Sequence, residues 1–90
     1  CISNLVWVAQ TQESRGSLRR ALAMYTRAYE RAPDDDALLE NVARLAATAG
    51  MNAEALKHYQ ELARRHPGDP RWRKAAQEQR EAVLRGVVKL

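Results

Sequence analysis

The sequence repeats itself every 34 residues, and no other feature restricts its fold as strongly. Residues 21–35 read ALAMYTRAYERAPDD and residues 55–69 read ALKHYQELARRHPGD. When residues 2–35 are aligned with residues 36–69 without a gap, 10 positions are identical. Self-similarity at one fixed period of this length is typical of solenoids, in which each unit packs only against its neighbours.

The first unit carries two stretches whose apolar residues recur at three- and four-residue steps, as on one face of an amphipathic helix. These stretches predict one helix over residues 3–14 and a second helix that Ser17 caps and that runs to about Arg31. Gly16 suits the turn between them, because a helix commonly ends at a residue in left-handed conformation. Pro33 marks the end of the second helix, since proline cannot continue a helix.

The second unit repeats this arrangement. We expect Asp36 to cap its first helix and Asn52 its second, since both side chains can accept hydrogen bonds from the first turn. Gly50 and Pro67 mark the two helix ends. The apolar stripes are Leu38, Leu39, Val42, Leu45 and Ala46 in the first helix, and Ala55, Leu56, Tyr59, Leu62 and Ala63 in the second.

Residues 70–90 begin like a third unit, but Leu84 stands where the turn glycine is expected and Gln77 where a small residue is expected. We therefore expect one long helix, fraying or ending near Gly86, that covers the apolar edge of the second unit. Its apolar stripe consists of Trp72, Ala76, Val83, Val87 and Leu90. Its outward charged residues are Arg73, Glu78, Arg80, Glu81 and Arg85.

These patterns predict an all-α fold, a right-handed α-solenoid of antiparallel helix pairs with about five helices. The units are residues 2–35 and 36–69, followed by a capping helix within residues 70–90. Four alanines are expected to let paired helices approach closely: Ala9, Ala21, Ala43 and Ala55. Tyr25 and Tyr59 are expected to fill the space between each pair and the following helix.

The pattern resembles that of the tetratricopeptide repeats. The first unit supplies Leu5, Val8, Ala9, Gly16, Ala21, Tyr25, Ala28 and Pro33. The second unit supplies Leu39, Val42, Ala43, Gly50, Ala55, Tyr59, Leu62 and Pro67. The chain departs from the family's pattern at Gln12 and Ala46, where an aromatic residue is usual, and at Leu62, where alanine is usual. The resemblance covers residues 2–69.

The resemblance implies that a ligand would lie in a concave groove lined by the first helix of each unit. The groove residues would be Ser3, Val6, Trp7, Gln10, Glu13, Glu40, Asn41, Arg44, Thr48, Arg71, Lys74, Ala75 and Glu78. One subfamily grips the C-terminal carboxylate of heat-shock chaperones with convergent lysine, asparagine and arginine side chains. Here only Asn41 matches that set, with Arg71 as a substitute for one lysine, so we do not expect this specific function.

Such a groove would combine an apolar part at Val6 and Trp7 with a basic part around Arg44, Arg71 and Lys74. It predicts a protein or peptide partner with an apolar anchor and a few acidic residues, and the net charge of +4 agrees with an acidic partner. The chain would then be a protein–protein interaction module with a scaffold or assembly role. Heavy use of Arg and Ala, with few Lys, suggests a bacterial genome. By analogy with the family, we expect a role in a multiprotein assembly.

Two other functions remain open at this point. The helix over residues 3–14 is apolar on most sides, so Ile2, Leu5 and Trp7 could pair with another copy of the chain, unless further repeats precede it. The chain could also be an RNA-binding helical repeat. This is the less favoured alternative, because the basic residues are spread along the chain instead of clustering in a stripe.

No catalytic, cofactor-binding or metal-binding arrangement is recognisable, and we expect neither an enzyme nor a cofactor. His58 and His66 are expected to be solvated surface residues. Cys1 suggests either a piece of a longer protein, which we favour, or the lipidated first residue of a bacterial lipoprotein. No apolar run approaches the length of a membrane span. The compartment, cytoplasmic or periplasmic, stays open.

Overall fold

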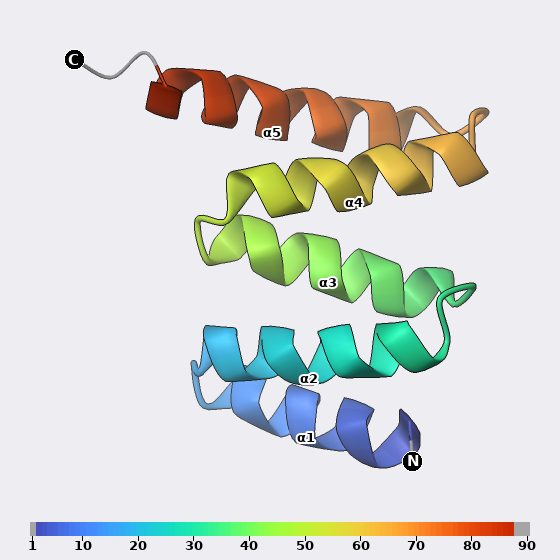
Figure 1. Cartoon of the computed structure of the whole chain (residues 1–90), viewed down its shortest axis with the longest axis vertical. Helices are drawn as coiled ribbons and strands as arrows, with labels where there is room; N and C mark the ends of the chain where they lie inside the picture. Colours follow the sequence, from blue (N-terminus) through green and yellow to red (C-terminus); the bar gives the residue numbers. More distant parts are fainter. Residues whose placement is uncertain (1, 88–90) are drawn as a thin grey trace.

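The computed structural model describes residues 2–87 as five helices that stack side by side in chain order (Figure 1). They are α1 (Ile2–Ser14), α2 (Leu18–Arg31), α3 (Asp36–Thr48), α4 (Asn52–Arg65) and α5 (Pro70–Val87). Each helix runs antiparallel to the one before it, and extensive packing joins helices that follow each other in the chain.

The predicted all-α, solenoid-like fold is confirmed, and no strand occurs in residues 2–87. Five helices fit two pairs followed by one capping helix, whereas the residue boundaries of the units stay a prediction. Predictions made for Cys1, for Leu90 and for the side chain of Val87 lie outside what the structure describes.

The turn inside each helix pair depends on glycine, as predicted. Gly16 and Gly50 have φ angles of 78° and 79°, in the left-handed region where a Cβ atom is strained. The N–H of Ser17 donates to the carbonyl of Gln12 at 2.8 Å, and an equivalent 2.8 Å bond runs from Met51 to Ala46. These bonds satisfy carbonyls at the helix ends, so the chain reverses within a few residues.

The cap of α3 lies one residue earlier than predicted. Asp35, not Asp36, holds this position, and its Oδ1 accepts from the N–H groups of Ala37 at 3.0 Å and Leu38 at 3.3 Å. A cap residue must stand outside the helix, whereas Asp36 already belongs to the first turn. Its carboxylate is therefore free to pair with residues at the end of α4.

The prediction that Asn52 caps α4 is also wrong. Asn52 is the first helical residue, and the cap position belongs to Met51, whose side chain forms no cap hydrogen bond. The turn at Gly50 is so short that the next residue, Met51, already occupies the N-cap position of α4. Ser17 stands at the cap position of α2, as predicted, but its side chain forms no cap hydrogen bond either.

Alanines occupy the crossings between helices, as predicted. Ala9, Ala21, Ala43 and Ala55 are fully buried. Tyr25 fills the space beside them and is only 2% exposed. Tyr59 lies between its pair and α5 as predicted and stacks on the ring of Trp72 at a centroid distance of 6.2 Å, but it is only half-buried. Tyr25 lies between two helix pairs, whereas Tyr59 has a pair on one side and the single helix α5 on the other.

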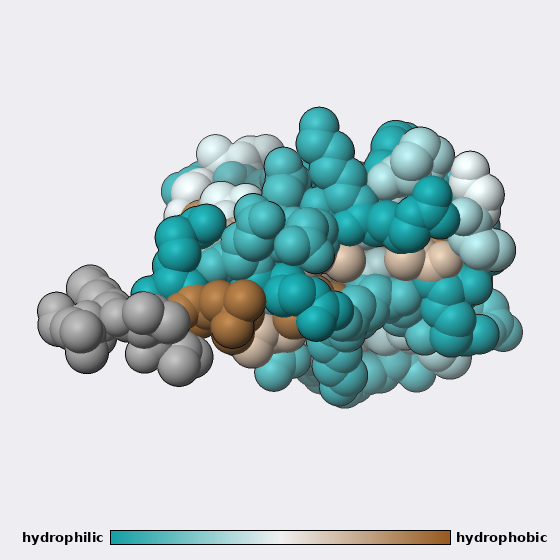
Figure 2. Space-filling view, turned by 90° about the horizontal axis from the view of Figure 1, so that it is seen from above, coloured by the Kyte–Doolittle hydropathy of each residue, from teal (hydrophilic) through white to brown (hydrophobic). Residues whose placement is uncertain are grey.

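Helix α5 docks through Trp72, which is 9% exposed and forms a core cluster with Leu39 and Leu62. Figure 2, seen from the α5 end, shows this end covered by hydrophilic side chains, with a hydrophobic patch beside the grey residues. Leu84, in the last turns of α5, is 54% exposed. The helix continues through Gly86. The charged residues predicted to face outward are all exposed: Arg73, Glu78, Arg80, Glu81 and Arg85.

Arg65, at the end of α4, ties this helix to the connection between α2 and α3. Its guanidinium group donates to Glu61 at 2.8 Å, to Asp36 at 3.0 Å and to the carbonyl of Pro33 at 2.7 Å. Arg64 and Arg65 lower the pKa of Glu61 to about 2. Because Arg65 is mostly covered by its partners, this junction resists relative movement of the two helix pairs.

The prediction that both histidines are solvated surface residues is confirmed for His66, which is exposed, and is wrong for His58. His66 shares a hydrogen bond with the carboxylate of Asp36, and Arg65 followed by His66 lowers the pKa of Asp36. His58 is half-buried, with its ring edge-on to Tyr29 at a centroid distance of 6.3 Å, and burial lowers its pKa. Helix spacing could not predict these contacts, because the partners lie about 30 residues away.

Candidate functional site

The stacking gives the molecule two faces. We call the surface formed by α1, α3 and α5 the odd-helix face, and the surface formed by α2 and α4 the even-helix face. All residues predicted to line a groove belong to α1, α3 or α5. An ion pair between Glu13 of α1 and Arg44 of α3 shows that neighbouring odd helices approach each other on this face.

Arg44 is the centre of the best-defined cluster on the odd-helix face. Its Nη1 donates to Oε2 of Glu13 at 2.7 Å, and its Nη2 donates to Oε1 of the same carboxylate at 3.3 Å. Nη2 also donates to Oδ1 of Asn41 at 2.9 Å. The hydroxyl of Thr48 donates to the backbone carbonyl of Arg44 at 2.9 Å. Four of the predicted groove residues therefore form one hydrogen-bonded group.

This cluster changes the role expected for Arg44. The sequence suggests a free cationic donor, but the guanidinium fork already holds Glu13, and this bond raises the pKa of Arg44. Bidentate arginine–carboxylate pairs are among the stronger hydrogen-bonded pairs in proteins. The buried phenol of Tyr25 lies close enough for Glu13 to add to the rise in its pKa that burial causes. Arg44 thus links α1 to α3 and offers little free charge.

Arg71 at the start of α5 is also paired. Its Nη2 donates to Oδ2 of Asp69 at 2.8 Å, and its guanidinium carbon lies 4.8 Å from the ring centroid of Trp72. The N–H of Arg71 donates to Oδ1 of Asp69 at 3.1 Å, so the same carboxylate holds the first turn of α5. Asp69, and to a smaller extent Glu40 of α3, raises the pKa of Arg71.

Lys74 and Glu78 follow on α5, one turn apart, and both are exposed. Neither forms an ion pair with another residue in the range 2–87. Because Arg71 and Lys74 are three positions apart, their side chains lie on the same side of the helix. Lys74 is therefore the predicted cation on this face whose charge is free to meet a ligand.

The apolar residues predicted on α1 behave differently from one another. Trp7 is 66% exposed, which is exceptional for a tryptophan in a small domain. Val6 is half-buried and packs against the core, as do Ile2 and Leu5. Gln10 is exposed one turn after Trp7. The apolar surface that α1 offers to solvent is therefore concentrated at Trp7.

Sequence reasoning missed how the two carboxylates Glu13 and Asp69 are used. Asp69 could have been recognised, since it takes the place in front of α5 that Asp35 takes in front of α3. No sequence signal identifies Glu13 as the partner of Arg44, because the two residues are 31 positions apart and both side chains are long.

No group of three or more histidine, cysteine, aspartate or glutamate side chains within residues 2–87 could hold a metal ion. No helix in the same part of the chain is long and apolar enough to cross a membrane.

One comparison with known proteins gives a match. The family model for the tetratricopeptide repeat matches residues 14–78, from the end of α1 to the middle of α5. No curated protein and no solved structure gives a significant match.

Proposed function

The chain belongs to the tetratricopeptide repeat family, a protein-interaction fold, and on this premise we propose that its odd-helix face binds a segment of a partner protein. The segment carries an apolar anchor and a few acidic residues. The chain serves as a scaffold in a multiprotein assembly, which its Arg- and Ala-rich composition suggests is bacterial. Other proteins, not small substrates, are then its ligands.

The observation that carries this proposal is the free charge of Lys74. Of the three cations predicted to line the groove, Arg44 and Arg71 are held by carboxylates of the chain itself, whereas Lys74 forms no ion pair within residues 2–87. The amide group of Asn41 can form a hydrogen bond with the partner. Glu40 and Glu78 repel carboxylates of the partner that come close to them. Trp7 supplies exposed apolar area of the kind that often anchors an interface.

Charge reversal at Lys74 tests the groove. Peptides selected by phage display against the whole chain serve as probes, and their affinities are measured by fluorescence anisotropy. We expect Lys74→Glu to weaken an acidic selected peptide about 10–100-fold, through lost attraction and like-charge repulsion. The melting temperature should hardly change, because Lys74 is exposed and makes no ion pair within residues 2–87.

The matched control is Arg20→Glu, which makes the same charge change on the exposed side of α2. It should weaken the peptide less than about threefold, since distant surface charges act only through a screened field. Equal losses for Lys74→Glu and Arg20→Glu would contradict the groove. Arg44→Glu is a poorer test, because it would place a second carboxylate beside Glu13.

Self-association through α1 is a second candidate function, and the exposure of Trp7 favours it. Helix α1 carries a single charged residue, Glu13, whereas the chain as a whole has a net charge of +4. Two copies could therefore meet through α1 with little like-charge repulsion. Ile2 and Leu5 are half-buried, so they contribute less to such a contact than the sequence suggests.

Sedimentation equilibrium tests this second candidate. We expect the wild-type chain to dimerise in roughly the micromolar range, the affinity of small interfaces with one aromatic anchor. The Trp7→Gln variant should sediment as a monomer with an unchanged circular dichroism spectrum. A wild-type chain that stays monomeric at millimolar concentration would rule the candidate out.

A further inference from the structure

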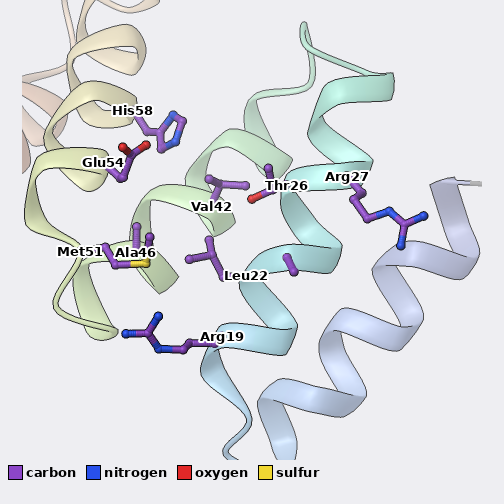
Figure 3. Close-up of a pocket in the computed structure, with 10 residues that line it drawn as sticks. Arg19, Leu22, Thr26, Arg27, Val42, Ala46, Met51, Glu54 and His58 are labelled. Carbon is purple, nitrogen blue, oxygen red and sulfur yellow. The ribbon is translucent and has the colours of Figure 1, made fainter.

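A cleft opens on the even-helix face between α2 and α4, with α3 as its floor (Figure 3). Its volume is about 450 Å³, which lies within the roughly 300–1,000 Å³ of pockets that bind ligands. Leu22, Val42 and Ala46 close the bottom, and Met51 lies at one end. Because Ala46 offers only a methyl group, the space above it stays open. None of the residues proposed to bind a partner on the odd-helix face borders this cleft.

The two walls of the cleft carry different charge. Helix α2 contributes Arg19 and Arg27, and α4 contributes Glu54 and His58. In Figure 3 the side chain of Arg19 reaches across the end of the cleft towards Met51. The guanidinium group of Arg27 instead lies on the side of α2 that faces α1. Arg19 is therefore the cation that an occupant of the cleft would meet first.

Helix α2 carries four arginines and a single acidic residue, Glu30. The four arginines of this helix form no ion pair within residues 2–87: Arg19, Arg20, Arg27 and Arg31. The first turn of α2 contains no acidic residue, and Ser17 gives no side-chain cap bond, so free N–H groups add to the positive potential. An anionic group is thus favoured at the Arg19 end of the cleft.

We infer that this cleft is a second docking site, separate from the odd-helix face and additional to the proposed function. Its occupant is an amphipathic helix of a partner protein that inserts an apolar side chain above Ala46 and directs carboxylates towards Arg19. A groove between two helices receives the ridge of a third by ordinary helix packing. On the partner helix, the carboxylates lie along only one edge of the apolar stripe. Carboxylates along the other edge would be repelled by Glu54 of α4.

Two capped peptides test this inference. In ELAELLQELAQ the glutamates lie along one edge of a leucine stripe, and in KLAKLLQKLAQ lysines replace them. The chain has two methionines, and Met51 borders the cleft whereas Met24 packs against the core outside it. With methyl-labelled methionine, we expect the acidic peptide to shift the Met51 signal and leave the Met24 signal in place. The lysine peptide should bind at least about 10-fold more weakly.

Variants of the whole chain localise the binding. Arg19→Glu should weaken the acidic peptide about 10-fold or more and strengthen the lysine peptide. Arg20→Glu is the matched control, since Arg20 is exposed and does not border the cleft; it should weaken the acidic peptide less than about threefold. Ala23→Phe should also abolish binding, because Ala23 is exposed at the mouth of the cleft and a ring there fills it.

Three results would overturn the inference: no Met51 shift with the acidic peptide, equal losses for Arg19→Glu and Arg20→Glu, or loss of the same binding in Lys74→Glu. A fourth result would overturn it as well: neither peptide binds, whereas single-stranded RNA binds the wild-type chain and loses affinity in Arg19→Glu. The proposed function is judged separately, because its test depends on Lys74 and on peptides selected without regard to the cleft. Either proposal can therefore be rejected without affecting the other.

Discussion

Tyr25→Ala should lower the free energy of unfolding by about 3–5 kcal/mol, the usual cost of deleting a buried aromatic side chain. The ring is 2% exposed and belongs to the core cluster that contains Ala9, Ala21 and Val42. A domain of this size is stabilised by only about 5–10 kcal/mol, so the variant should be close to unfolding at physiological temperature. Urea denaturation followed by far-ultraviolet circular dichroism measures the loss.

Tyr25→Phe is the control for this prediction. It keeps the ring and removes only the hydroxyl group, which donates no hydrogen bond in the described structure. The loss should stay below about 1 kcal/mol, as for a hydroxyl without a partner. If Tyr25→Ala lowers the free energy of unfolding no more than Tyr25→Phe does, the ring of Tyr25 does not fill the space between the two helix pairs.

Trp72→Ala should have a comparable effect, but confined to one end of the molecule. Trp72 joins α5 to Leu39 and Leu62 and stacks on Tyr59, so its removal should cost about 3–5 kcal/mol. Because α5 contacts the rest of the chain mainly through α4, we expect this helix to detach before the others unfold. Hydrogen exchange should show faster exchange of the α5 amides, with those of α2 and α3 less affected.

Trp7→Ala is the matched control, since the same substitution is made at a side chain that is 66% exposed. It should change stability by less than about 0.5 kcal/mol, the usual range for surface positions. Uniform acceleration of exchange in all five helices of the Trp72→Ala variant would contradict local detachment of α5. It would mean that the stack unfolds as one cooperative unit.

The helices, the left-handed glycine turns and the alanine crossings all follow from the sequence. Their signals are local: a periodicity of 3.6 residues, a glycine where a helix must reverse, and a small residue at each contact. The repeat shows each of these signals twice. Gly16 and Gly50 occupy equivalent positions in the two units, as do Ala9 and Ala43, so each prediction is made from two independent occurrences. The groove residues, in contrast, are expected from the resemblance to the tetratricopeptide repeats, and their role stays a prediction.

The same reasoning cannot find pairs between distant side chains. Glu13 with Arg44, and Asp36 with Arg65 and His66, lie about 30 residues apart and meet only once the helices have a defined rotation about their axes. A long charged side chain can reach several partners through different rotamers. Which partner it pairs with depends on the relative positions of the helices, and the periodicity of the sequence does not define these positions.

The sequence by itself therefore determined the order, the lengths and the pairing of the helices, because these depend on interactions within a few turns. The tertiary structure alone decided which charges remain free. It left Lys74 and Arg19 unpaired within residues 2–87 while Arg44 and Arg71 were engaged, and it buried Tyr25 more deeply than its repeat equivalent Tyr59. It also opened the cleft between α2 and α4. These outcomes depend on how neighbouring helices are packed, a property that no single helix carries in its own residues.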